Sequence, residues 1–264
     1  MMKKKALYLL FSVALVFSAG CGKNKQSITL AGSTAFQPFA EKLAEQYMTS
    51  NPGATITVQG GGSAVGIQSA LSGAAQIGMA DLVNLPPEAK DLSATVVARD
   101  GIAVVINPAN KVNNLTTGQI RDIFNGKIKN WKEAGGADKT ITVVSREAGS
   151  GTRTSFEEII TGIELVGEAL IQESNGTIRE TVANDAGAIG YLSHGLLNEK
   201  IKAVQIDGQD CTTECIMTQK YLLVRPIFLL TKAQPGAEVQ RMIDYILSPE
   251  GQQTIQQNGL ITAK

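Results

Sequence analysis

Apolar and polar positions follow each other along this chain in short blocks of two kinds. Runs of apolar and β-branched residues, such as residues 28–30, 77–80 and 102–106, predict strands. Between them lie segments with the helical period, and in the clearest one apolar side chains recur at offsets 0, 3, 4, 7, 8, 11 and 12 from Phe36 to Met48. Strands that alternate with helices in this way are typical of an α/β protein.

Several predicted strands end in loops of small and hydroxyl residues that open a helix. In open α/β sheets ligands bind beyond the carboxyl ends of the strands, and helix N-termini there offer free N–H groups to an anion. Glycine lets the backbone approach a ligand, and a guanidinium adds forked donors. The segments that combine these features are Gly32-Ser33-Thr34-Ala35, Gly60-Gly61-Gly62-Ser63, Asp81, and residues 146–153, which contain Arg146 and Ser150-Gly151-Thr152. Together they predict a site for a small oxyanion.

The first part of the chain has the pattern of an export signal. Lys3, Lys4 and Lys5 precede an apolar stretch, residues 6–17, that is too short for a permanent membrane helix. Small residues then lead to Cys21, as in a bacterial lipoprotein signal, although Ser18 stands where such signals prefer Leu. We predict a signal peptide at residues 1–20, a lipidated Cys21 at the start of a tether over residues 21–26, and a location in the periplasm or at the cell surface. A secreted protein with an unmodified Cys21 is the alternative.

Charge and cysteine content narrow the possible functions. The chain has 24 basic and 24 acidic residues, and without the three signal lysines it has 21 against 24, a net charge near −3. This balance argues against a nucleic-acid partner, because such binders present basic surfaces. An oxidising compartment favours a disulfide between Cys211 and Cys215. A metal site at these cysteines would need further ligands, and the chain has one histidine.

These motifs, in this order, resemble one known family. The chain is similar over residues 29–264 to the phosphate-binding subunits of ABC phosphate importers, the PstS family, and Arg146 followed by Ser150-Gly151-Thr152 is the most specific match. The resemblance implies an α/β, two-lobed periplasmic-binding-protein fold of type II-like form, with a hinge and a ligand cleft between the lobes. Lobe one would comprise residues 27–105 plus 225–264 and lobe two residues 106–224. Further matching motifs are Ile106-Asn107-Pro108, residues 123–131, residues 187–191 and Arg225-Pro226.

The resemblance also implies roles for individual residues. Arg146 would pair with phosphate oxygens, hydroxyls and backbone N–H groups would donate to them, and Asp81 would accept a hydrogen bond from the protonated oxygen. No catalytic residue, cofactor or metal is implied. The protein would act as a monomer whose closed form is recognised by the membrane permease. The candidate contacts are Thr34, Ala35, Ser63 and Asp81 from lobe one and Arg146, Ser150, Gly151 and Thr152 from lobe two.

Asp81 is the residue from which we predict the ligand. An ionised carboxylate accepts hydrogen bonds but cannot donate them, so it suits an anion that still carries a proton. Phosphate carries one near neutral pH, whereas sulfate does not. An unpaired buried polar contact costs roughly 1–3 kcal/mol, and about 1.4 kcal/mol is tenfold in affinity. Arsenate, which is also protonated, stays an alternative ligand, and Asp81 as a cap of the turn before Pro86 is the alternative interpretation of the residue.

Two further points stay open in the sequence. Members of the family carry an aspartate two residues after the binding arginine, where this chain has Ala148 with Glu147 beside it, so the group that orients Arg146 is undetermined. A phosphohydrolase would need metal ligands or an activated nucleophile, and Ala148 breaks the Gly-x-Ser-x-Gly pattern around Ser150. We therefore predict a binding protein and not an enzyme. The sequence also leaves open a binder of sulfate or molybdate, and a surface signalling or adhesion protein that has lost its ligand.

Overall fold

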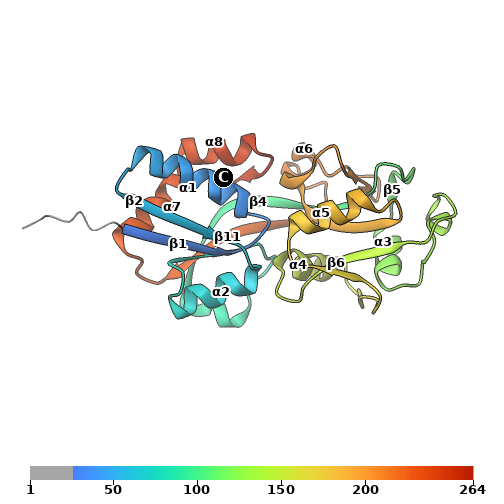
Figure 1. Cartoon of the computed structure of the whole chain (residues 1–264), viewed down its shortest axis with the longest axis horizontal. Coiled ribbons are helices and arrows are strands. Elements are labelled where there is room, and N and C mark those ends of the chain that lie inside the picture. The colour runs from blue at the N-terminus through green and yellow to red at the C-terminus, as the bar shows by residue number, and fades with distance from the viewer. Residues whose placement is uncertain (1–25, 264) are drawn as a thin grey trace, which may run out of the picture.

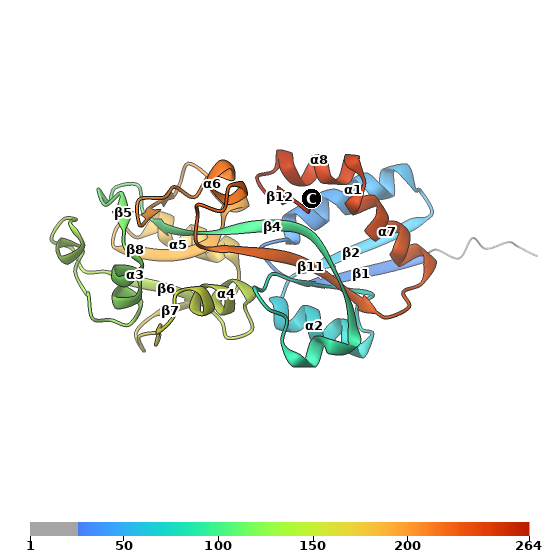
Figure 2. The same cartoon turned by 180° about the vertical axis from the view of Figure 1, so that it is seen from behind.

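The computed structural model describes residues 26–263, which form two groups of elements side by side (Figures 1 and 2). Two long strands, β4 (Leu92–Ile106) and β11 (Val224–Lys232), run from one group into the other. The first group contains β1 (Gln26–Gly32), α1 (Gln37–Ser50), β2 (Ala54–Gln59), α2 (Ser63–Ser72), β3 (Ile77–Ala80), the 3-10 helix Pro87–Asp91, α7 (Ala237–Leu247), α8 (Pro249–Gln257) and β12 (Ile261–Thr262).

The second group lies between β4 and β11 in the chain. It contains β5 (Asn114–Leu115), α3 (Thr117–Phe124), the 3-10 helix Trp131–Ala134, β6 (Thr142–Arg146), α4 (Gly151–Ile159), β7 (Leu170–Gln172), α5 (Asn175–Asn184), β8 (Ala188–Ser193), the 3-10 helix His194–Leu196, β9 (Lys202–Ala203), β10 (Gln205–Ile206) and α6 (Thr213–Met217). Both groups alternate strands and helices, as the sequence predicts.

One sheet path joins the two groups through the crossing strands. The strand order is β2-β1-β3-β11-β4-β8-β6-β7, with β9 and β12 also paired to β4. The pairs of β1 with β2 and β3, and of β6 with β7 and β8, are parallel, whereas β3, β11, β4 and β8 pair antiparallel at the centre. The candidate residues lie at or after the carboxyl ends of β1, β2 and β3 on one side and of β6 on the other.

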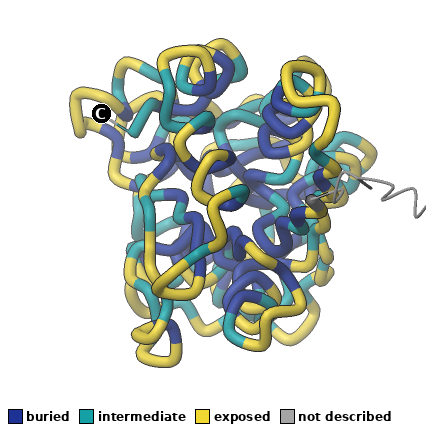
Figure 3. Tube along the Cα trace, turned by 90° about the vertical axis from the view of Figure 1, so that its left-hand side faces the viewer, coloured by how far each residue is buried: buried dark blue, intermediate teal, exposed yellow. Residues whose placement is uncertain are grey.

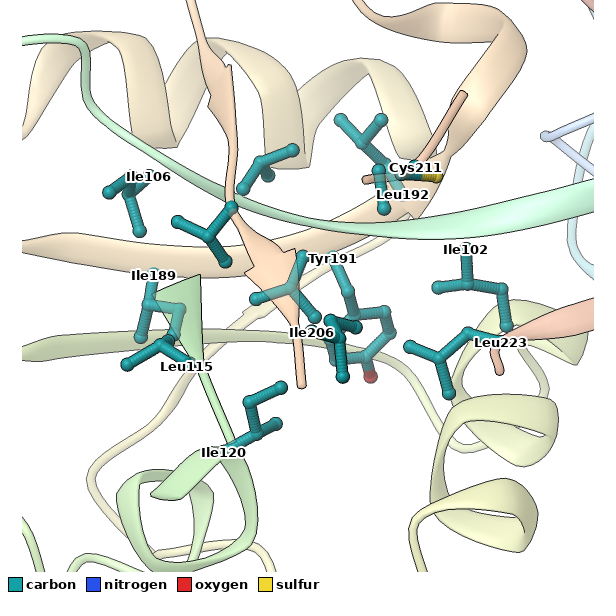
Figure 4. Close-up of a cluster of buried hydrophobic side chains, with 14 of the residues drawn as sticks. Ile102, Ile106, Leu115, Ile120, Ile189, Tyr191, Leu192, Ile206, Cys211 and Leu223 are labelled. Carbon is teal, nitrogen blue, oxygen red and sulfur yellow. The ribbon is translucent and has the colours of Figure 1, made fainter. Parts of the chain in front are cut away.

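Each group has its own large hydrophobic core. Val97 and Ala98 of β4 belong to the core of the first group, whereas the following part of the same strand, residues 102–106, belongs to the core of the second. Figure 4 shows part of this second core, with Ile102 and Tyr191 among its members. Along the described part of the trace the buried segments lie inside and the exposed ones outside (Figure 3). Strand β4 therefore connects two separately packed units.

The predicted helix with the apolar stripe is confirmed. α1 buries Phe39, Ala40, Leu43, Ala44 and Tyr47 against the first core. These positions face one side because the helix repeats every 3.6 residues. Pro38 lies in the first turn, where a missing N–H removes no helical hydrogen bond.

Several element bounds differ from the prediction. The strand predicted at residues 102–106 is the end of the longer β4, which begins at Leu92 and pairs with β11. A proline inside a strand removes a hydrogen-bond donor, but β11 tolerates Pro226 opposite Arg99. Helix α5, which starts at Asn175 and is capped by Ser174, is not evident in the sequence because its residues are mostly polar.

Cys211 and Cys215 do not form the predicted disulfide, since both thiols are free. Cys211 is buried in the second core, where its sulfur packs close to Gly101 (Figure 4). Cys215 lies in helix α6, and its backbone N–H donates to the hydroxyl of the capping residue Thr212 at 3.2 Å. Burial raises the pKa of the Cys211 thiol, which disfavours the reactive thiolate.

The predicted signal peptide and the lipidated Cys21 lie outside the described residues. Within residues 26–263, no helix combines the length and the apolar character needed to cross a membrane.

Candidate functional site

Three helices begin where the two groups of elements meet. Among the described residues, α1 and α2 start without a side-chain cap, and the N-cap of α2 is Gly62 with φ 86°. Helix α4 is capped by Ser150, whose hydroxyl accepts from the Arg153 N–H at 3.3 Å. At α1 the N–H groups of Ala35 and Phe36 donate to the Ser33 hydroxyl, and that of Gln37 donates to the Ser33 carbonyl. The uncapped start of α2 leaves backbone N–H groups for another acceptor, and the helix dipole favours a negative one.

The two sides of the site touch each other. Gly151 lies so close to Ser63 and Asp81 that a Cβ built on it would fall 2.1 Å from the Ser63 hydroxyl oxygen. The backbone N–H of Ala64 donates to the Gly149 carbonyl at 3.1 Å. A groove of about 230 Å³ opens beside this contact, lined in part by Ser63 and Gly151. The two groups of elements are thus in direct contact at the candidate residues.

The structure brings the candidate residues together at this contact. Thr34 is half-buried, and the other seven candidate residues are buried. Ala35 differs from the expectation, because its backbone N–H is already used: it donates to the Ser33 hydroxyl at 3.2 Å. The buried candidate residues are Ala35, Ser63, Asp81, Arg146, Ser150, Gly151 and Thr152.

Arg146 is held by the residue next to it in the chain. Its Nε donates to Glu147 Oε2 at 2.8 Å and its Nη2 donates to Glu147 Oε1 at 2.7 Å, a forked pair. The carbonyls of Gln172 and Glu173 accept further bonds from the same guanidinium. Glu147 therefore orients Arg146 in place of the aspartate that the family carries at position 148.

One nitrogen of the Arg146 guanidinium donates to none of the described residues. Nη1 is buried and has no hydrogen-bond partner among the described residues. Buried charged donors almost always find an acceptor, because an unpaired one costs the full desolvation penalty. The side chain is 1% exposed, so bulk water does not compensate. This nitrogen is the donor that an anion would complete.

Asp81 accepts hydrogen bonds from both sides of the site. Its Oδ1 accepts from the Ser63 hydroxyl at 2.7 Å and its Oδ2 from the Thr152 hydroxyl at 3.1 Å. Oδ2 also lies 2.5 Å from Nη1 of Arg225. The carboxylate thus faces other candidate residues, and the 3-10 helix after Pro86 has no side-chain cap among the described residues. The geometry favours the ligand interpretation of Asp81 over the turn cap.

Sequence reasoning missed three buried polar residues around the site. Asn175 donates through Nδ2 to the Thr34 hydroxyl at 3.0 Å. Arg225 joins Asp81 to Asp100, and burial raises the pKa of Asp100 against the opposing charge of Arg225. The sequence carries no local signal for these contacts: Asp100 and Arg225 lie within strands, although Arg225 belongs to a matching motif, and Asn175 lies at a helix start.

Known proteins match this chain along most of its length. The family model described as a PBP superfamily domain matches residues 18–250. The phosphate-binding protein PstS of Bacillus subtilis is 34% identical over 273 residues, which cover 96% of this chain and 91% of that protein. The PstS of Borreliella burgdorferi is 25% identical over 278 residues, with 99% of each chain covered.

Solved structures agree with the sequence matches. A phosphate ABC transporter substrate-binding protein from Clostridium perfringens, with bound phosphate, superposes with a TM-score of 0.87 at 39% identity, covering 90% of this chain and 100% of that one. An ABC-type phosphate transport receptor from Vibrio cholerae gives 0.75 at 35% identity, covering 89% and 99%. The predicted periplasmic-binding-protein fold and the family resemblance are confirmed. The chain belongs to the PBP superfamily and, within it, to the PstS family of phosphate-binding proteins.

Proposed function

We propose that this protein captures inorganic phosphate outside the cytoplasm and delivers it to the permease of an ABC phosphate importer. The observation that carries the proposal is Arg146 Nη1, a buried cationic donor without a partner among the described residues, at a meeting point of helix N-termini and hydroxyl groups. Such a set of donors suits a small tetrahedral anion. The relatives are named as substrate-binding and phosphate-binding proteins, which supports binding without turnover.

The proposed contacts are the eight candidate residues. Arg146 pairs with phosphate oxygens through Nη1, and the hydroxyls of Ser63 and Thr152 turn from Asp81 toward the anion. Asp81 then accepts a hydrogen bond from the proton that phosphate carries. The N–H of Ala35 already donates to the Ser33 hydroxyl at 3.2 Å, so it contacts phosphate only by sharing its proton between the two acceptors. The remaining contacts come from Thr34, Ser150 and Gly151.

The proposed lobes close on phosphate by a hinge. The sequence assigns residues 27–105 plus 225–264 to lobe one and residues 106–224 to lobe two. Because residues 102–106 pack in the second core, we place the first crossing earlier in β4, near Asp100. Contacts from both lobes favour the closed state when ligand is bound.

Titration calorimetry of the purified protein with phosphate, arsenate, sulfate and molybdate tests the binding proposal. We expect phosphate to bind far more tightly than sulfate or molybdate. Arg146→Ala should weaken phosphate binding by about 2–5 kcal/mol, because it removes a desolvated charged partner. Arg179→Ala is the control, since that arginine pairs with Glu180 on the surface of lobe two. Sulfate that binds more tightly than phosphate, or an unimpaired Arg146→Ala variant, would disprove the proposal.

The proposal also covers location and partners. Residues 1–20 are removed as a signal peptide, Cys21 carries lipid, and residues 21–26 tether a monomer to the membrane. Cell fractionation tests this: Cys21→Ser should move the protein from the membrane fraction to the soluble fraction. A membrane-bound Cys21→Ser variant would argue against the anchor. A phosphatase assay with added divalent metal tests the prediction that the protein is not an enzyme, and robust turnover would contradict it.

A further inference from the structure

A buried arginine outside the candidate contacts touches Asp81. Arg225 lies in β11, directly across from Asp100 of β4 in the antiparallel register. Its Nη1 lies 2.5 Å from Asp81 Oδ2 and donates to the Asp81 carbonyl at 3.2 Å. Its Nη2 donates to Asp100 Oδ2 at 2.9 Å. One guanidinium thus joins a carboxylate of the ligand cleft to both strands that cross between the lobes.

The two hydroxyl groups that donate to Asp81 can rotate and donate to another acceptor instead. Ser63 and Thr152 each donate one hydroxyl proton to it. A hydroxyl has a single proton, so while it donates to Asp81 it presents lone pairs to its other neighbours. Both hydroxyls must release Asp81 before they can donate to an anion. Arg225 is then the described side chain that still donates to the Asp81 carboxylate.

The charge of Arg225 is permanent, whereas that of a buried carboxyl is not. A guanidinium keeps its proton in proteins. A buried carboxyl without a counter-charge takes up a proton, because desolvation disfavours its ionised form. Asp100 illustrates both effects: burial raises its pKa, and the charge of Arg225 is the largest opposing cause. The Asp81 side chain is 2% exposed, and its Oδ2 lies 2.5 Å from Nη1 of the same guanidinium, against 2.9 Å between Asp100 Oδ2 and Nη2.

We propose that Arg225 is a positioning residue that determines specificity: it keeps Asp81 ionised in the closed cleft, so that the site selects a protonated tetrahedral oxyanion. The inference rests on the proposed function. With the charge of Arg225 removed, Asp81 becomes a neutral carboxyl that can donate a hydrogen bond. A site with that donor accepts a bare oxygen, and sulfate then binds better relative to phosphate.

The test compares Arg225→Gln with Arg225→Lys by titration calorimetry with phosphate and with sulfate. Glutamine keeps hydrogen-bond donors but has no charge, whereas lysine keeps the charge. We expect Arg225→Lys to retain the phosphate-to-sulfate affinity ratio of the wild type and Arg225→Gln to lower it by roughly tenfold or more. An equal loss for both anions in Arg225→Gln, with the ratio unchanged, would overturn the inference and leave Arg225 a structural residue.

Asp100→Asn is the matched control, because it removes the other carboxylate and leaves Arg225 with Asp81. We expect this variant to keep the ratio. A ratio that falls as far as in Arg225→Gln would mean that selectivity depends on the crossing strands and not on the charge beside Asp81. If Arg225→Gln does not fold, the double variant with Asp100→Asn gives the same measurement without an unpaired carboxylate at position 100.

A spectroscopic measurement gives an independent test without any change at Arg225. Infrared difference spectra of the phosphate-bound wild type against Asp81→Asn should contain the band of an ionised carboxylate, and the band of a protonated carboxyl would overturn the inference. The wild-type titrations separate this inference from the proposed function. A wild type that binds no phosphate refutes the function, whereas a selective wild type with an unchanged ratio in Arg225→Gln refutes this inference alone.

Discussion

Glu147 shows how one side chain can replace a missing one. It holds Arg146 by a forked pair while Nη1 of the arginine stays without a partner among the described residues. Its carboxylate is partly accessible, so its charge costs less to keep than a fully buried one would. The arginine thereby gains a fixed orientation and retains a donor for a ligand.

We expect Glu147→Ala to weaken phosphate binding by about 1–3 kcal/mol, because Arg146 loses two charge-assisted bonds that fix its direction. Calorimetry on the variant measures the effect. Glu157→Ala is the control: Glu157 pairs with Arg153 on α4 and makes no described bond to Arg146. If both variants bind phosphate as the wild type does, Glu147 does not orient the arginine.

Tyr191 makes the free energy of unfolding depend on pH in the alkaline range. Burial raises its pKa from 10.0 to about 12, although bonds to Ser145 and Arg146 oppose the shift. The unfolded chain loses this proton near pH 10 and the folded chain near pH 12. Stability is therefore full below about pH 10 and falls by about 2–3 kcal/mol as the pH rises to about 12.

Urea unfolding at several pH values checks this prediction. The Tyr191→Phe variant should be less stable at neutral pH by about 1 kcal/mol, because the Ser145 hydroxyl and the Arg146 N–H lose a partner. It should also lose less stability than the wild type between about pH 10 and about pH 12. An identical alkaline slope in both proteins would assign the whole effect to other groups, such as the buried Tyr221, whose pKa is also raised by burial.

At the scale of elements, the start of α4 requires glycine at one position and tolerates a side chain two residues earlier. A Cβ on Gly151 would lie 2.1 Å from the Ser63 hydroxyl and 2.6 Å from the Asp81 carbonyl, both on the opposite lobe. A Cβ on Gly149 would meet its nearest neighbour, Ala64 Cβ, at an ordinary 3.4 Å. The tight contact at Gly151 is thus one between the two groups of elements and not within α4.

Gly151→Ala should therefore fold but close poorly. Alanine is the better helix former, and the clash is between lobes. Overpacking of this kind costs about 1–3 kcal/mol, so phosphate affinity should fall roughly 5- to 150-fold, while Gly149→Ala stays near wild type. Calorimetry together with thermal unfolding of the phosphate-free proteins checks both statements. A tight-binding Gly151→Ala variant would show that closure does not bring α4 against Ser63.

The elements that can be predicted well from the sequence are those with a local signal. The stripe of α1 and the strand-to-helix loops can be identified within short windows, and these loops carry the candidate contacts. The missed residues act over long sequence distances: Arg225 meets Asp81 across 144 positions, and Asn175 meets Thr34 across 141. No periodicity encodes such a pair. Tertiary packing decides which lone polar residue becomes a partner and which stays on the surface.

For the molecule as a whole, a few hydrogen bonds join the two groups of elements, and Ser155 of α4 makes two of them. Its hydroxyl donates to the Asp81 carbonyl at 3.3 Å and accepts the Val83 N–H at 3.2 Å. Its neighbour Thr154 instead bonds back to Ser150 within its own lobe at 3.1 Å. Substitutions at Ser155 therefore test contacts between the lobes, whereas substitutions at Thr154 test contacts within lobe two.

Ser155→Ala should make closure less favourable without destabilising lobe two. Two net hydrogen bonds of about 0.5–1.5 kcal/mol each predict a loss of about 1–3 kcal/mol in phosphate affinity, because a ligand bound between lobes depends on the closed fraction. Small-angle scattering checks the mechanism: the wild type and Thr154→Ala should contract on addition of phosphate, and Ser155→Ala should need more phosphate to contract equally. If all three contract at the same phosphate concentration, these bonds do not govern closure, and the balance between open and closed forms depends on the ligand contacts alone.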